Sequence, residues 1–137
     1  MVMKKIAVTG STMWENRVGI KDLLFDLKKR FGKELVIYSG GLKAGVDIYV
    51  RKFCMEFDIE LIEVPPRHYQ WNYRCLEPSY KYGVEYKANQ IYIRNELLAK
   101  TADYFFVFID KDDSTGIFTD LVSRCNKKKK KNVPITN

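Results

Sequence analysis

Short turns rich in glycine and hydroxyl side chains are the segments of this sequence best suited to chemistry. The turn Ser39-Gly40-Gly41 is followed by Gly45 and Asp47. Glycines at a turn let backbone amides approach a ligand closely, and the N-terminus of a following helix favours an anion. The pattern predicts a phosphate-binding turn, or a tight turn whose glycines serve only the backbone conformation. Neither GxGxxG nor GxxxxGK(S/T) occurs, so the standard dinucleotide and P-loop motifs are absent.

Two further turns have the same character and also follow apolar runs. Thr9-Gly10-Ser11-Thr12 comes after the run 6–8, and Ser114-Thr115-Gly116 comes shortly after the run 104–109. If these runs are parallel strands, their carboxyl ends meet at one edge of a sheet, where such folds bind ligands. We therefore expect all three turns to contribute to one ligand-binding site.

Acidic residues near the last turn could serve a metal. Asp110, Asp112 and Asp113 form a cluster that would suit magnesium, although the same residues suit a turn and the cap of the next helix, which we favour. His68 is the only histidine, which argues against a metal site built from histidines and against a Ser-His-Asp triad. We predict no metal site, no cofactor and no catalytic triad.

Apolar periodicity predicts the elements that position these turns. Strands are expected at 6–8, 35–38, 59–64, 104–109 and 133–135. Apolar residues at helical spacing predict four helices. Their faces are Ile20, Leu23, Leu24, Leu27 and Phe31; Val46, Val50, Phe53 and Phe57; Ala88, Ile91, Tyr92, Asn95 and Leu98; and Phe118, Leu121, Val122 and Cys125.

This alternation predicts an α/β fold. We expect a single Rossmann-like, doubly wound domain over 1–137, with about five mainly parallel strands and helices on both faces. Parallel neighbours need crossover connections, and right-handed crossovers place helices on the two faces of the sheet.

Asn95 is unusual because it lies on the apolar face of its predicted helix. A buried amide costs free energy unless it is hydrogen-bonded. Either Asn95 is a satisfied core amide that ties two elements together, or it faces the site with Arg94 beside it; we favour the site.

The segment 65–83 shows no clear periodicity but is rich in aromatic and cationic side chains. It could form a lid in which Trp71 or Tyr69 stacks on a base while Arg67 or Arg74 contacts phosphates. The same composition is typical of an oligomer interface. The two interpretations are compatible if the pocket lies at a subunit boundary.

The charge of the chain depends on one run of lysines. The 137 residues carry a formal net charge of +7, and the run 127–131 consists of five consecutive lysines. We interpret this run as the solvated, cationic end of the last helix, with general nucleic-acid affinity as the lesser alternative.

Compartment signals favour the cytoplasm. Cys54, Cys75 and Cys125 are an odd number without a CxxC pair, which predicts reduced thiols rather than a disulfide framework or a zinc site. The N-terminal apolar stretch is too short for an export signal, and no stretch is long enough to span a bilayer. We expect a cytoplasmic protein without membrane contact.

Taken in order, the motifs resemble those of the SLOG superfamily, especially its small YspA-like members. The resemblance rests on TGS at 9–11, YSGG at 38–41 with AGVD at 44–47, IRN at 93–95, ADYFFVF at 102–108, STG at 114–116 and VPI at 133–135. It covers nearly the whole chain. It implies a Rossmann-like binder of a nucleotide or nucleotide derivative, with relatives among cytokinin-activating phosphoribohydrolases, the DNA-processing protein DprA and sensor domains of antiviral systems.

The resemblance also implies roles for single residues. The phosphate and ribose region would be lined by Gly10, Ser11, Gly40, Gly41, Gly45 and Asp47, with Arg94, Asn95, Ser114 and Gly116 opposite. Phosphoribohydrolases carry a carboxylate four residues after a conserved glycine, and Asp120 stands four residues after Gly116. Asp120 and Arg94 would be the catalytic residues if the chain were an enzyme, although an acid in the first turn of a helix is also ordinary.

These observations lead to one main hypothesis and two alternatives. The main one is a homo-oligomeric protein that binds a nucleotide or an NAD-derived nucleotide at the carboxyl edge of its sheet, for sensing or sequestration. The alternatives are an N-glycosidase or phosphoribohydrolase, and a DprA-like nucleic-acid binder that uses the lysine run.

Overall fold

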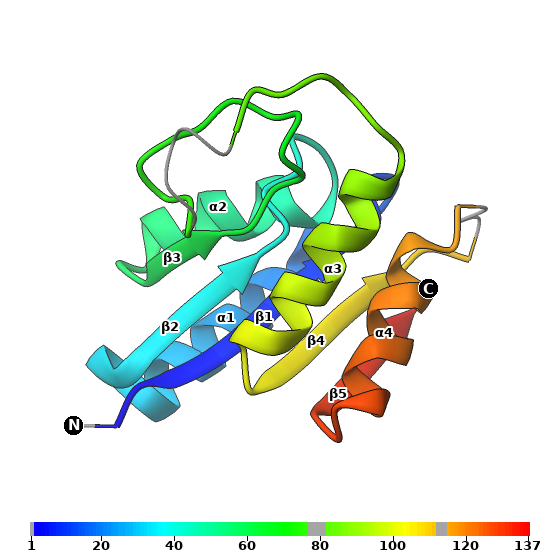
Figure 1. Cartoon of the computed structure of the whole chain (residues 1–137). Coiled ribbons are helices and arrows are strands. Elements are labelled where there is room, and N and C mark those ends of the chain that lie inside the picture. Colours follow the sequence, from blue (N-terminus) through cyan, green and yellow to red (C-terminus); the bar gives the residue numbers. More distant parts are fainter. Residues whose placement is uncertain (1, 77–81, 112–114) are drawn as a thin grey trace.

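The computed structural model describes residues 2–76, 82–111 and 115–137, which form one five-stranded sheet covered by helices (Figure 1). The first half comprises β1 (Lys4–Gly10), α1 (Arg17–Phe31), a short 3-10 turn (Gly32–Glu34), β2 (Leu35–Ser39) and α2 (Val46–Glu56). The second half comprises β3 (Glu60–Glu63), α3 (Asn89–Thr101), β4 (Tyr104–Ile109), α4 (Ile117–Lys127) and β5 (Lys131–Thr136).

All strand pairs in the sheet are parallel, and the strand order is β3-β2-β1-β4-β5. The chain proceeds from β1 outward to β3, then crosses to β4 on the other side of β1. The order therefore reverses between β1 and β4, which is the topological switch point of the sheet. The predicted α/β fold with parallel strands is confirmed.

The helices cover the two faces in pairs, and the strands alternate accordingly. Ile6 and Val8 of β1 belong to the core under α1 and α2, whereas Ala7 belongs to the core under α3 and α4. This alternation follows from the two-residue period of a strand. Both faces are apolar, as expected for a sheet whose strands are all parallel.

The expected element bounds differ slightly from the observed ones. The first and last strands are longer than predicted, at 4–10 and 131–136, and the third is shorter, at 60–63. The predicted apolar face of α3 is only partly right: Asn95 and Leu98 are buried, but Ala88 and Tyr92 are exposed. Arg94 takes the place of an apolar residue on the buried face.

The lysine run has structural partners as well as solvent. The Nζ of Lys130 donates to the carbonyl of Ala102 at 2.6 Å and to that of Lys100 at 3.3 Å, which satisfies carbonyls at the end of α3. Lys128 forms an ion pair with Glu96 at 2.7 Å. Part of the positive charge is thus used to join α4 and β5 to α3.

No helix in the described ranges is long and apolar enough to cross a bilayer.

Candidate functional site

The turns after β1 and β4 are joined through Ser11. Its hydroxyl accepts a hydrogen bond from the N–H of Asp110 at 2.9 Å, and its own N–H donates one to the carbonyl of Phe108 at 2.9 Å. The carbonyl of Ser11 accepts the N–H of Val46 at 3.3 Å, so the start of α2 also rests on this turn. Ser11 is buried, and these contacts give it the role of a support for the carboxyl edge of the sheet.

Close packing of this turn requires two glycines. A Cβ at Gly10 would lie 2.2 Å from the carbonyl oxygen of Phe108, and one at Gly45 would lie 2.2 Å from that of Ser11. Gly45 also has a φ of 64°, which side chains disfavour. Part of the glycine pattern therefore reflects backbone packing.

The turn after β2 contains a buried polar cluster centred on Gly40. Asp47 accepts a hydrogen bond from the hydroxyl of Thr9 at 2.7 Å and another from the N–H of Leu42 at 3.1 Å. The Nη1 of Arg94 donates to the carbonyl of Gly40 at 2.7 Å. Asp47 and Arg94 thus face the same glycine from α2 and α3, on opposite faces of the sheet.

Burial dominates the electrostatics of this cluster. It raises the pKa of Asp47 from 3.8 to about 6, although the charge of Arg94 and the hydrogen bonds from Thr9 and Leu42 act in the opposite direction. Burial likewise lowers the pKa of Arg94, and the charge of Asp47 opposes that effect. Two charges of opposite sign are therefore kept inside the protein, where each depends on the other.

Arg94 is oriented by its neighbour Asn95. The Nε of Arg94 donates to the amide oxygen of Asn95 at 3.0 Å, and the amide nitrogen of Asn95 donates to the carbonyl of Ile117 at 2.8 Å. Asn95 therefore acts as a satisfied core amide that joins α3 to the start of α4. These hydrogen bonds match the first of the two alternatives posed by the sequence, and Asn95 also fixes the guanidinium of Arg94.

Asp120 is held by two donors. Its carboxylate accepts a hydrogen bond from the amide nitrogen of Asn95 at 3.1 Å and another from the Nε of Arg124 at 2.8 Å. Arg124 in turn contacts Glu96 at 3.4 Å. This arrangement suits a carboxylate that connects α3 and α4, and no observation favours Asp120 as a nucleophile.

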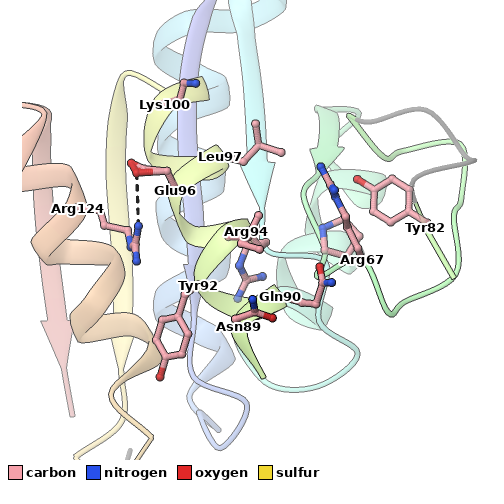
Figure 2. A pocket seen from close by; sticks show the side chains of 12 residues that line it. Arg67, Tyr82, Asn89, Gln90, Tyr92, Arg94, Glu96, Leu97, Lys100 and Arg124 are labelled. Atoms are coloured by element: carbon pink, nitrogen blue, oxygen red, sulfur yellow. Dashed lines mark hydrogen bonds and ion pairs between the residues drawn. The ribbon is translucent and has the colours of Figure 1, made fainter. Parts of the chain in front are cut away.

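A cavity of about 450 Å³ lies along α3 and against the segment that follows β3 (Figure 2). This volume is in the range of small-molecule pockets. The lining residues come from the 65–67 segment, the start of the 82–88 segment, α3 and α4: Pro65, Arg67, Tyr82, Asn89, Gln90, Tyr92, Ile93, Arg94, Glu96, Leu97, Lys100 and Arg124.

The cavity combines apolar walls with cations and a few unpaired polar atoms. Four cationic side chains line it against one carboxylate, that of Glu96. The Nη2 of Arg94 and the Oε1 of Gln90 are buried without a hydrogen-bond partner in the described part of the chain. Buried polar atoms are nearly always paired, so these two atoms point to a missing ligand or water.

The loop after β3 is fastened by a buried carboxylate. Glu63 accepts two hydrogen bonds from the guanidinium of Arg51, at 2.8 and 2.9 Å, and one from the amide of Asn72 at 3.2 Å. This contact anchors the segment 65–76, which arches over the carboxyl ends of β2 and β3 (Figure 1).

Only some aromatic and cationic residues of this loop face the cavity. Arg67 lines it, whereas Trp71 is 45% exposed and Arg74 packs over the ring of Tyr73. Tyr69 lies beside Lys43, whose Nζ is 5.6 Å from its ring centroid. The charges of Arg94 and Asp47 both influence the pKa of Tyr69, which burial raises.

The structure places the predicted site residues in different settings. Gly40, Asp47, Arg94 and Asn95 are brought together in the buried polar cluster, together with Thr9. The turns with Gly10, Ser11, Thr12, Thr115 and Gly116 lie at the ends of β1 and β4, and Thr12 and Thr115 are exposed. Ser39 is buried and its hydroxyl accepts the N–H of Gly41 at 3.1 Å. Ser114, Asp112 and Asp113 lie outside the described residues.

Sequence reasoning missed most of the cavity lining. Gln90, Tyr82, Leu97 and Lys100 carry no motif, and the cavity is displaced from the switch point between β1 and β4 toward the outer face of α3. One signal in the sequence could have indicated this cavity. Gln90 and Arg94 are polar and four residues apart, a spacing that places both side chains on one face of a helix. Among the described residues, no group of three metal-ligating side chains could hold an ion.

Comparison with known proteins finds no family model and no curated protein that matches this chain. Solved structures similar to it include the following two. One is the molybdenum cofactor binding protein from the phototrophic bacterium Rippkaea orientalis, with a TM-score of 0.71, 16% identity, and coverage of 100% of this chain and 78% of that chain. The other is the molybdenum cofactor carrier protein MCP from Chlamydomonas reinhardtii, with a TM-score of 0.65, 18% identity, and coverage of 98% and 78%. At these identities the similarity shows a shared fold.

A Cβ at Gly40 should disrupt the polar cluster. It would lie 2.6 Å from Nη1 of Arg94, 2.7 Å from the carboxylate of Asp47 and 2.9 Å from the hydroxyl of Thr9. We expect Gly40→Ala to lower the free energy of unfolding by about 1–3 kcal/mol in urea denaturation.

Gly19→Ala is the matched control, because a Cβ there meets nothing within 4 Å. In the helix α1 it should stabilise the protein by about 0.5–1 kcal/mol. Equal stabilities of the two variants would contradict this account.

Asp47 should make stability depend on pH. Its folded pKa of about 6 exceeds the value of 3.8 for an unperturbed group, so the folded state binds more protons between these values. The contribution of Asp47 to stability is therefore greatest below pH 3.8, falls as pH rises, and reaches its minimum above pH 6.

The variant Asp47→Asn removes this titration. Relative to the native chain, its free energy of unfolding should rise on going from pH 4 to pH 7, by on the order of 3 kcal/mol for this shift. Urea denaturation of both proteins at several pH values measures the difference. Parallel stability profiles would show that Asp47 titrates normally.

Proposed function

We propose that this chain binds a small anionic ligand that joins a flat heterocycle to a phosphate, such as a nucleotide or an NAD-derived nucleotide, in the cavity beside α3. The observation that carries the proposal is the cavity itself, with its excess of cations and its two unpaired buried polar atoms. Sensing, sequestration or delivery of the ligand would need nothing beyond such binding.

The distribution of polarity in the cavity supports a ligand with two unlike parts. Pro65, Tyr82 and Leu97 offer apolar surface against which a ring packs. Arg67 and Lys100 bring positive charge to the same cavity, and cations of this kind bind phosphate. We assign the ring to the apolar walls and the phosphate to these cations.

The start of α3 adds to the attraction for an anion. This helix has no side-chain cap at its N-terminus and no acidic residue in its first turn. The N–H groups of Gln90 and Ile91 already donate to backbone carbonyls, so it is the macrodipole that favours electronegative ligand atoms at the end of the cavity where Asn89 and Gln90 lie.

The two similar solved structures support ligand binding of this kind. Both are described as binding or carrying the molybdenum cofactor. That cofactor, like a nucleotide, joins a nitrogen heterocycle to a phosphate, so the same class of ligand would suit this chain. Membership in the SLOG superfamily remains part of our proposal and rests on the order of motifs from TGS at 9–11 to STG at 114–116.

Self-association and a cytoplasmic location complete the proposal. The outer face of α3 exposes apolar side chains, with Tyr92 38% and Ile93 46% accessible. Large apolar groups beside a cavity favour contact with a second copy. The three cysteines are all free, which fits a reducing compartment.

Ligand binding is tested by identifying and titrating small molecules. Mass spectrometry of compounds released from the purified protein should find a phosphorylated heterocycle. Calorimetry with inosine 5′-monophosphate, adenosine 5′-monophosphate, NAD-derived nucleotides and molybdopterin should give a dissociation constant well below millimolar for at least one of them. If none co-purifies and none binds more tightly than millimolar, the proposal is wrong.

The cationic residues should control affinity and its dependence on salt. Arg67→Gln and Lys100→Gln should each weaken binding roughly three- to tenfold and flatten the salt dependence, because each removes a charge from the phosphate. Arg17→Gln at the exposed start of α1 is the control and should leave the affinity unchanged. An equal effect of all three variants would point to a nonspecific influence of net charge.

Self-association is tested by sedimentation. Ile93→Lys should shift the native chain toward the monomer, because it places a charge on the proposed contact face. Val18→Lys makes a comparable change on α1, where Val18 is exposed on the other side of the sheet, and should have no effect. A monomeric native chain would refute the proposed interface.

A further inference from the structure

Two unpaired polar atoms of opposite character occur on one turn of α3. Among the described residues, the Nη2 of Arg94 is a donor without an acceptor, and the Oε1 of Gln90 is an acceptor without a donor. Residues four apart on a helix are neighbours on its surface, with Cβ atoms about 5–6 Å apart. Both side chains line the cavity, and Figure 2 shows the guanidinium of Arg94 directed toward the first turn of α3, where Gln90 lies.

The position of Arg94 is fixed by the fold rather than adjustable. Its side chain is only 3% exposed, and its other nitrogens are engaged by the carbonyl of Gly40 and the amide oxygen of Asn95. The remaining nitrogen, Nη2, therefore has a defined position before any ligand arrives. A preorganised donor next to an acceptor is the arrangement that proteins use to recognise the edge of a heterocycle.

We propose that Gln90 and Arg94 recognise the ring edge of the ligand and select an oxo heterocycle, in which a carbonyl oxygen adjoins a ring N–H. This inference rests on the proposed function, since it concerns the ring of the same ligand. The carbonyl oxygen accepts the hydrogen bond from Nη2 of Arg94, and the ring N–H donates to Oε1 of Gln90. Hypoxanthine, guanine, uracil and pterins all present such an edge.

The same pair rejects adenine. At the positions where hypoxanthine has an acceptor and then a donor, adenine has a donor, its amino group, and then an acceptor, its ring nitrogen. With the phosphate bound to Arg67 and Lys100, the ring cannot turn over freely. Adenine then sets donor against donor and acceptor against acceptor, and leaves buried groups unpaired.

Calorimetry with two nucleotides tests the proposal on the full chain. Inosine 5′-monophosphate should bind at least about tenfold more tightly than adenosine 5′-monophosphate, since a site built for a hydrogen bond discriminates strongly against a ligand that lacks it. In Gln90→Leu, binding of the inosine nucleotide should weaken about tenfold or more while that of the adenosine nucleotide changes little. The preference between the two should then shrink to the part that Nη2 of Arg94 contributes.

Matched variants separate recognition from structure. Asn89→Leu replaces the neighbouring amide, which also lines the cavity but has no unpaired buried atom, and should keep the preference. Gln90→Glu retains an acceptor and should keep it too. Gln90→Leu removes an unpaired buried acceptor, so its melting temperature should not fall; a role confined to structure would lower it. A nucleotide methylated at N1 of hypoxanthine should bind the native chain and Gln90→Leu equally.

The outcomes distinguish this inference from the proposed function. Equal binding of the inosine and adenosine nucleotides, or an equal effect of Gln90→Leu on both, would refute the selection of an oxo heterocycle and leave ligand binding intact. Failure of every phosphorylated heterocycle to bind, molybdopterin included, would refute both.

Discussion

The buried guanidinium of Arg94 is the constraint on which the rest of the site depends. A charge inside a protein is tolerated only when it is hydrogen-bonded and paired. Arg94 obtains these partners from three elements: the carbonyl of Gly40 after β2, the amide of Asn95 on α3, and the opposite charge of Asp47 on α2. The absence of a side chain at Gly40 is what lets all of them meet.

The same network of polar contacts also joins α3 to α4. Asn95 orients Arg94 on one side and binds Ile117 and Asp120 on the other. Arg124 then continues the chain of polar contacts from Asp120 to Glu96. A ligand that accepts a hydrogen bond from Nη2 of Arg94 would therefore contact a network that already reaches the start of α4, close to the turn after β4.

The cavity follows from where the helices place their polar residues, and the sequence alone revealed only part of it. The sequence indicates Arg67 and Arg94 as candidate binding residues, and both line the cavity. Trp71, a candidate for stacking, is exposed. The carboxylate oxygens of Asp47 accept hydrogen bonds from the hydroxyl of Thr9 and the N–H of Leu42. Nothing in a linear pattern distinguishes a carboxylate that faces a ligand from one that supports a turn, because the difference lies in which backbone groups reach it.

The sequence by itself determined the α/β fold, the parallel strands and the position of the three turns, because apolar periods of two and of about 3.6 residues record which faces are buried. It also placed Asn95 on a buried face. Only the tertiary structure decided that Arg94 is buried beside it, that Lys130 closes the end of α3, and that the cavity lies along α3 rather than above β1 and β4. Those outcomes depend on contacts between residues distant in the chain, which local spacing does not record.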